Sequence, residues 1–290
     1  MRMGVTFPQT ELGGDVGALR AYGQGVEELG FTHVLAYDHV VGADPAVHTD
    51  WNGPYDVDTT FHEPFVMFGY LAAAAPKLDL VTGIIIVPQR QTGLVAKQAA
   101  EVDLLTNGRF RLGVGIGWNA VEYETLGEDF HNRGKRSEEQ IELMRLLWTQ
   151  RSVTFEGNYH RVTGAGLAPL PVQQPIPVWI GAASKRAFQR VGRVADGWFP
   201  MVAPGSGLDY ARSIVDEAAT AAGRDPASLG MEGRVDWRGD VDAISSDLAA
   251  WADAGASHVS VNTMGAGLDG VDEHLAALST VAEQASPRFG

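Results

Sequence analysis

Apolar and polar positions follow two periods along the chain, and segments of the two kinds alternate from one end to the other. Short runs rich in β-branched and aromatic residues are each followed by a segment of helical periodicity that stops near a glycine or proline. The run LDLVTGIIIV at 78–87 is apolar throughout, which is typical of a strand buried on both faces. The predicted strands are Met3–Phe7, His33–Tyr37, Leu78–Val87, Arg109–Val114, Val178–Ile180, Gly197–Phe199, Gly230–Trp237 and His258–Val261.

The helical segments complete eight strand–helix units. They are predicted at Val16–Leu29, Pro64–Ala75, Leu94–Leu105, Ser137–Trp148, Lys185–Val194, Leu208–Ala222, Val241–Ala254 and Val271–Ala285. Eight such units predict an α/β fold, a (β/α)8 TIM barrel that forms a single domain over 1–290, with a doubly wound sheet as the alternative. The alternation is interrupted by a long loop after the second strand, at 40–63, and by an insertion after the fourth strand, with a short extended pair at Val153–Val162.

Composition narrows the class of partner. The 290 residues are 45% hydrophobic, enough for a large core, and carry a net charge of -14, which argues against nucleic acid or an anionic membrane as the main partner. There is no cysteine, which excludes disulfides and thiol nucleophiles, and no apolar stretch approaches the ~20 residues of a membrane helix. We therefore expect a cytoplasmic protein that acts on a small molecule.

In a barrel of this kind the site lies at the carboxyl ends of the strands. Asp38 and His39 follow the second strand, and a histidine beside a carboxylate can move protons near neutral pH. We predict that His39 is catalytic and that Asp38 orients it. The alternative is an Asp that caps a turn, with an exposed His beside it.

Aromatic residues gather near the same end of the predicted barrel. Trp51 and Tyr55 lie in the long loop after the second strand, where a loop of this length is usually functional or disordered. Phe7 ends the first strand, and Trp118 follows the fourth. We expect these four side chains to shape an apolar substrate pocket, with the loop as its lid. A surface loop without function is the alternative.

Three glycines at 113, 115 and 117 end the fourth strand. A dinucleotide fingerprint would require a third glycine where Trp118 stands, at the start of a helix, so that interpretation fails. Gly115 and Gly117 instead indicate close approach of a ring or of a neighbouring strand. Packing of the barrel alone is the alternative.

A phosphate site is predicted after the fifth strand. Free N–H groups at the start of a helix, a hydroxyl and a cation suit one phosphate, and the turn that provides them contains Gly181, Ala182, Ala183, Ser184 and Arg186. An ordinary strand–helix turn is the alternative. The histidines and carboxylates show no metal-binding spacing, so no metal site is predicted.

Three segments carry a resemblance to the bacterial luciferase-like monooxygenase family, in particular to its oxidoreductases that depend on coenzyme F-420, an 8-hydroxy-5-deazaflavin. They are ELGFTHVLAYDHV at 28–40, LVTGIIIVPQRQTGLVAKQAAEVDLLTNGRFRLGVGIGW at 80–118, and PIPVWIGAASKRAFQRVGRVADGWFP at 175–200. The resemblance implies a TIM barrel that holds the cofactor at the carboxyl ends of its strands.

The resemblance also implies roles for individual residues. Asp38 would lie near the deazaflavin and His39 over its reactive face, with the phosphate around Gly181–Ser184. Several members of the family have a non-proline cis peptide in the third strand, at the position of Gly83 and Ile84. Trp118 stands where the family's sugar-phosphate dehydrogenases have a glutamate, so we expect a more apolar, conjugated or carbonyl substrate.

The expected activity is therefore hydride transfer between coenzyme F-420 and an organic substrate. One alternative is an FMN-dependent monooxygenase of the same fold that uses molecular oxygen. Another is a non-catalytic protein that only binds a flavin. The resemblance further implies a homodimer.

Overall fold

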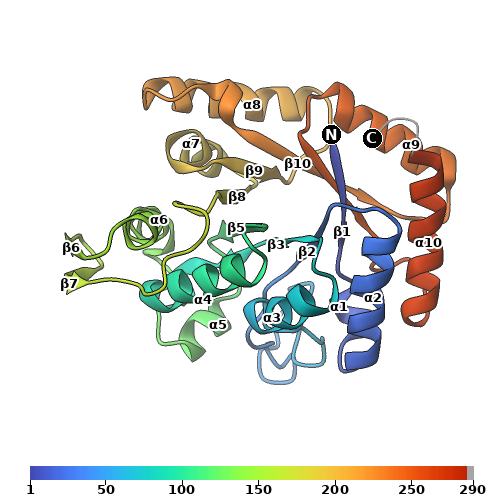
Figure 1. The fold of residues 1–290 in the computed structure, drawn as a ribbon, viewed down its shortest axis with the longest axis horizontal. Helices are drawn as coiled ribbons and strands as arrows, with labels where there is room; N and C mark the ends of the chain where they lie inside the picture. The colour runs from blue at the N-terminus through green and yellow to red at the C-terminus, as the bar shows by residue number, and fades with distance from the viewer. Residues whose placement is uncertain (286–290) are drawn as a thin grey trace.

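Eight parallel strand positions close into a barrel in the computed structural model, which describes residues 1–285 (Figure 1). The order around the barrel is β3-β2-β1-β11-β10-β9-β8-β5, and pairing of β3 with β5 closes it. The third position is divided between β3 and the short β4. These strands are β1 (Arg2–Thr6), β2 (His33–Ala36), β3 (Asp79–Thr82), β4 (Ile85–Ile86), β5 (Phe110–Gly115), β8 (Val178–Ala182), β9 (Gly197–Pro200), β10 (Gly230–Asp236) and β11 (His258–Asn262). The predicted TIM barrel is confirmed.

Helices surround the strands, and the apolar core fills the layer between them. The eight that alternate with the strands are α2 (Val16–Glu28), α3 (Pro64–Ala74), α4 (Thr92–Leu105), α6 (Arg133–Thr149), α7 (Lys185–Val194), α8 (Ser206–Ala221), α9 (Val241–Asp253) and α10 (Gly270–Ala285). Shorter helical pieces are α1 (Gln9–Leu12), α5 (Ala120–Thr125), η1 (Val87–Gln89) and η2 (Pro226–Ser228). No helix in residues 1–285 is both long and apolar enough to span a membrane.

Two boundaries near the site differ from the sequence prediction. The segment after Trp118, expected to be a loop, contains α5, which begins where the Asn119 side chain accepts a hydrogen bond from the N–H of Val121 at 3.0 Å. Helix α6 begins at Arg133 instead of Ser137. Ser137 lies within the first turns of the helix, where its hydroxyl donates to the carbonyl of Gly134. The short α5 was missed because it has only six residues.

The insertion after the fourth strand position forms an antiparallel hairpin of β6 (Val153–Glu156) and β7 (Arg161–Ala165), which lies beside α6 at the edge of the molecule (Figure 1). His160 fastens it to the barrel. Its Nε2 lies 2.7 Å from the Thr92 hydroxyl on α4, and its Nδ1 lies 2.8 Å from the Glu139 carboxylate on α6.

A charged cluster fills the barrel interior toward the amino ends of the strands. The buried carboxylate of Glu232 lies 2.9 Å from the His33 ring and 2.8 Å from the Arg111 guanidinium, and it accepts a hydrogen bond from Ser260. Although burial alone raises it, Arg111 and the His33 ring hold the pKa of Glu232 well below its usual range. The guanidinium also lies 4.5 Å from the centre of the Trp179 ring. We call this cluster of Glu232, His33, Arg111 and Ser260 the polar floor of the barrel.

The glycines of β5 allow it to approach the divided third strand closely. A Cβ on Gly113 would lie 1.8 Å from the carbonyl oxygen of Thr82, and one on Gly115 would lie 2.4 Å from Ile84. Gly117 has a φ of +62° and a Cβ there would meet Ile86 at 2.7 Å. Of the predicted alternatives, the structure therefore shows close approach to a neighbouring strand.

This contact predicts an unequal response to the same substitution. Gly113→Ala places a methyl group against backbone that has no rotamer to adopt, so we expect a loss of about 3 kcal/mol or more in the free energy of unfolding. Gly69 lies inside α3, and a Cβ added there would have no neighbouring atom within 4 Å, so Gly69→Ala should add about 0.5–1 kcal/mol. Denaturant unfolding of both variants checks this, and equal effects would contradict it.

Candidate functional site

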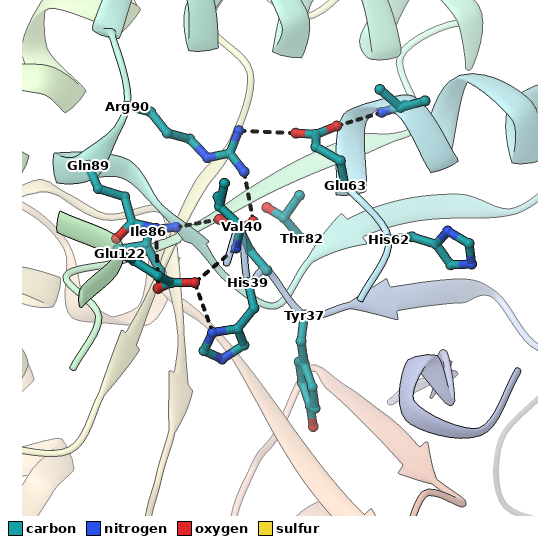
Figure 2. Close-up of polar contacts among 12 residues, drawn as sticks. Tyr37, His39, Val40, His62, Glu63, Thr82, Ile86, Gln89, Arg90 and Glu122 are labelled. Atoms are coloured by element: carbon teal, nitrogen blue, oxygen red, sulfur yellow. Dashed lines mark hydrogen bonds and ion pairs between the residues drawn. The ribbon is translucent and has the colours of Figure 1, made fainter. Parts of the chain in front are cut away.

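Asp38 lies at the carboxyl end of β2 and binds the chain that follows the divided third strand. Its fully buried carboxylate accepts a hydrogen bond from the N–H of Ile86 at 3.0 Å and one from Nη2 of Arg90 at 2.7 Å (Figure 2). Nη1 of Arg90 donates to Glu63 at 3.0 Å, and Glu63 also accepts from the N–H of Val66 at the start of α3. Asp38 therefore ties three parts of the barrel rim together.

The two partners respond differently to burial. Burial raises the pKa of Asp38 above its ordinary value, and the contacts with Arg90 and Ile86 only partly offset this. Burial alone would lower the pKa of Arg90, but the carboxylates of Asp38 and Glu63 raise it. Arg90 therefore stays charged, and its charge favours the ionised form of Asp38.

His39 is held by Glu122, which lies on α5. The fully buried carboxylate of Glu122 lies 3.1 Å from Nδ1 of His39, accepts from the N–H of Val40 at 2.9 Å, and lies 3.5 Å from the amide nitrogen of Gln89 (Figure 2). A carboxylate at this place favours the proton on Nδ1. The opposite nitrogen, Nε2, has no hydrogen-bond partner among residues 1–285 and is left to exchange a proton.

The prediction that Asp38 orients His39 is therefore wrong. Asp38 points toward Ile86 and Arg90, while the carboxylate that contacts His39 comes from a helix more than eighty residues away in sequence. Adjacent residues at the end of a strand point in different directions, so sequence adjacency did not bring these two side chains together.

Four aromatic side chains surround His39 or pack next to it. The centre of its ring lies 4.9 Å from that of Tyr55, 4.8 Å from that of Phe61 and 5.6 Å from that of Trp118. Trp51 packs on Trp118 at 5.5 Å. The long loop after β2 therefore folds over the His39 ring, and it brings Phe61, which the sequence did not single out. Trp51, Tyr55 and Trp118 pack on His39 or on one another and do not line the cavity described below, so their role in a substrate pocket stays a prediction.

Phe7 is not part of this cluster. Its side chain is fully buried in the hydrophobic core, where its ring lies 5.3 Å from that of Tyr22 on α2. The prediction that Phe7 lines a substrate pocket is corrected accordingly. Side chains alternate along β1, and it is Thr6 that faces the barrel interior.

A cavity of about 410 Å³ occupies the upper part of the barrel. Toward the inside it reaches Thr6, Gly83 and the polar floor at Glu232. The peptide bond between Gly83 and Ile84 is cis, at the position that the family resemblance indicated. The cavity therefore reaches the divided third strand at Gly83.

The cavity also extends through the wall of the barrel. Strands β9 and β10 pair where they begin, at Gly197 with Gly230 and Trp198 with Met231. Beyond these pairs the lining includes the segment Phe199–Pro204 and, outside the sheet, Asp247, Ala250 and Trp251 of α9. A ligand in the barrel can therefore extend between the two strands toward α9.

The segment predicted to bind a phosphate forms the turn between β8 and α7, and Arg186 does not line the enclosed space beside it. Ser184 begins α7, and its hydroxyl accepts from the N–H of Ala187 at 3.4 Å. Gly181 and Ala182 end β8, and Ala183 is exposed beside them. Arg186 is also exposed. The buried cation of this region is Arg190, which together with Gly115 and Gly181 lines a small space between α6, α7 and the strand ends.

Three residues of the site were missed in the sequence. Glu122 lay in a segment taken for an acidic loop, and only its place on one turn of helix reveals that it points inward. Arg90 follows a run of apolar residues and gave no signal apart from being a cation in a buried segment. Arg190 lies within a predicted helix about one turn after Arg186, and the helical spacing alone does not tell which of the two is enclosed. No group of three or more His, Asp or Glu side chains within the described 285 residues is arranged to hold a metal ion.

Comparison with known proteins identifies the family to which this chain is similar. A family model described as luciferase-like monooxygenase matches residues 1–285. An uncharacterised protein of Mycobacterium tuberculosis is 31% identical over 200 residues, which are 68% of this chain and 68% of that protein. An FMNH2-dependent dimethylsulfone monooxygenase of Pseudomonas fluorescens is 31% identical over 209 residues, 70% of this chain and 56% of that protein.

Solved structures show the same fold. An F-420-dependent secondary alcohol dehydrogenase in complex with an F-420–acetone adduct superposes with a TM-score of 0.78. The superposition covers 97% of this chain and 98% of that one, at 18% sequence identity. At this identity the likeness concerns the fold alone.

The buried contacts of Glu122 predict a structural cost. Glu122→Ala leaves the N–H of Val40 without an acceptor in a buried place, so we expect a loss of about 2–3 kcal/mol in the free energy of unfolding. Glu124 lies on the same helix but is exposed, so Glu124→Ala should stay within about 0.5 kcal/mol of the parent. Chemical denaturation measures both, and a neutral Glu122→Ala would show that the carboxylate is dispensable for the fold.

Proposed function

The chain belongs to the luciferase-like monooxygenase family, and from this premise we propose that it transfers a hydride between coenzyme F-420 and an organic substrate of apolar, conjugated or carbonyl character. The observation that carries the proposal is His39, fixed by the buried Glu122 at the carboxyl end of the barrel with its Nε2 left to exchange a proton. A histidine held in one tautomer, with its other ring nitrogen without a partner among the described residues, is suited to proton exchange near neutral pH.

The residues of the barrel mouth fit a planar cofactor with a phosphate. Gly83 lines the cavity. Gly115 of β5 and Gly181 of β8 have no side chain and therefore leave room for the side chain of Ile84. The exposed hydroxyl of Ser184 and the first N–H groups of α7 are available to a phosphate. When bound, the deazaflavin would supply or accept the hydride at its C5.

The side chains of this protein would then divide the remaining work. His39 exchanges the proton that accompanies the hydride, and Glu122 keeps its ring oriented. Asp38 and Arg90 hold the strand end against which the cofactor would rest. The aromatic loop excludes water, and Trp118 presents an apolar wall where sugar-phosphate dehydrogenases of the family carry a glutamate.

An FMN-dependent monooxygenase is the second candidate. It is favoured by the similarity to the dimethylsulfone monooxygenase, which is higher in sequence identity than the likeness to the F-420-dependent dehydrogenase. Both functions use the same barrel mouth. They differ in whether molecular oxygen reacts with the reduced cofactor.

Titration of the purified apoprotein with each cofactor separates the two candidates. We expect coenzyme F-420 to bind more tightly than FMN, measured by fluorescence, and reduced F-420 to be consumed with substrate but without oxygen uptake. The reverse preference together with oxygen consumption would establish the monooxygenase instead. Binding of either cofactor without turnover over a broad set of ketones, enones and alcohols would support a binding protein.

The role of His39 predicts a separation of binding from turnover. His39→Gln keeps a hydrogen-bonding group next to Glu122 but cannot carry a proton, so we expect kcat to fall about 10²–10⁴-fold. The Kd for the cofactor should stay close to that of the parent. His131 is exposed, and His131→Gln serves as the matched control with unchanged kinetics. A parallel loss of cofactor affinity and turnover in His39→Gln would overturn the assignment.

A further inference from the structure

Arg234 lines the cavity in the barrel mouth and takes no part in the contacts of Asp38 or Glu122. Along β10, Glu232, Arg234 and Asp236 alternate with outward-facing residues, and Glu232 already points to the interior floor. Arg234 therefore extends into the barrel one step above the floor. It lines the cavity, and 49% of its side chain is exposed there.

The contacts of Arg234 fix its side chain without using up its donors. Its Nε lies 3.3 Å from the carboxylate of Asp236, which in turn accepts a hydrogen bond from the Asn262 amide at 2.9 Å. Its Nη1 lies 3.4 Å from the hydroxyl of Tyr37. Apart from the contact of Nη1 with Tyr37, the Nη groups have no hydrogen-bond partner among residues 1–285, so they are available to a ligand in the cavity. A guanidinium held in this way can bind an oxygen of a ligand.

Tyr37 brings a phenol to the same place. It follows β2, its backbone carbonyl accepts from the Gln9 side chain, and its ring points away from the contact between Arg90 and Glu63 (Figure 2). Its side chain lines the cavity together with Gly83 and Arg234. His39, two residues later, is enclosed by aromatic rings and is not part of this lining. The cavity thus has its own proton donor, next to a cation.

We propose that Arg234 and Tyr37 bind the oxygen of a carbonyl substrate or of the alcohol that corresponds to it. In the reducing direction the hydride of the reduced cofactor adds to the carbonyl carbon, the C=O π bond breaks, and the electron pair moves to oxygen. Arg234 stabilises the charge that develops on that oxygen, and Tyr37 donates its proton to it; solvent then returns a proton to the phenolate. The cofactor is oxidised and the carbonyl is reduced to an alcohol.

This assignment rests on the proposed hydride transfer and names the substrate class. It also separates two proton-handling groups. His39 accepts the proton that the reduced cofactor loses together with the hydride, and Tyr37 donates a proton to the substrate oxygen. The passage between β9 and β10, lined by Phe199, Ala250 and Trp251, would then accommodate an apolar substituent of the carbonyl compound.

A carbonyl chromophore tests the assignment without cofactor. The absorption of 4-(dimethylamino)cinnamaldehyde moves to longer wavelength when its oxygen receives a hydrogen bond or lies next to a cation. We expect the full-length apoprotein to bind this aldehyde with such a shift. Tyr37→Phe and Arg234→Gln should each lose most of the shift and raise the Kd about tenfold, which is the loss expected for one hydrogen bond of this kind.

A second arginine–tyrosine pair on the outside of the barrel provides matched controls. Nε of Arg20 donates to the Tyr70 hydroxyl at 3.0 Å, far in sequence from the cavity residues. Arg20→Gln and Tyr70→Phe should bind the aldehyde like the parent. Thermal unfolding of all four variants verifies that they fold.

Two results would overturn the assignment: no binding of the aldehyde by the parent protein, or an unchanged spectral shift in both Tyr37→Phe and Arg234→Gln. Neither depends on turnover. A shift that is present and is lost in the two variants, combined with no hydride transfer from either cofactor, would instead refute the proposed function and leave the oxygen site standing.

Discussion

The site depends on the close approach of β5 to the divided third strand. Between β3 and β4 the chain leaves the regular hydrogen-bonded ladder, and the residues at this break need space on the adjacent strand β5. Gly113, Gly115 and Gly117 provide that room, because any side chain there would collide with Thr82, Ile84 or Ile86. The N–H of Ile86 in turn donates to Asp38, and Gly83 lines the cavity. A backbone contact between two strands thus positions groups contributed by several others.

Two buried carboxylates at the rim show how such a scaffold is used. Asp38 is paired with a guanidinium and a backbone N–H, which partly offset its burial, and its contacts hold the rim together. Glu122 has a histidine and two nitrogen donors as partners, so its charge is available to orient a group that titrates. The two acids lie near each other, yet their neighbours direct them to different work.

The sequence was sufficient for the barrel and for the neighbourhood of the site. All eight strand positions were located within a few residues, because buried parallel strands have apolar runs that are hard to mistake. The partners within the site were not accessible in the same way. His39 was identified from its position after a strand, but Glu122 contacts it through a six-residue helix whose sequence resembles a loop.

Two further errors have the same origin in side-chain direction. Phe7 was predicted to face the pocket, but Thr6 does. A shift of one residue along a strand turns a side chain from the barrel interior to the core between strands and helices. Arg186 and Arg190 differ by about one helical turn, and only packing against α6 decides which of them is enclosed.

The residues that line the opening of the barrel wall between β9 and β10 are different from those that hold the buried carboxylates. The lining there comes from the segment after β9 and from α9, and those side chains take no part in holding the carboxylates at the opposite rim. Substitutions at its exposed positions, such as Met201, can accumulate during divergence without disturbing the contacts of those carboxylates. Descendants of one ancestral barrel can therefore acquire new substrates by exchanging a few side chains along a single seam.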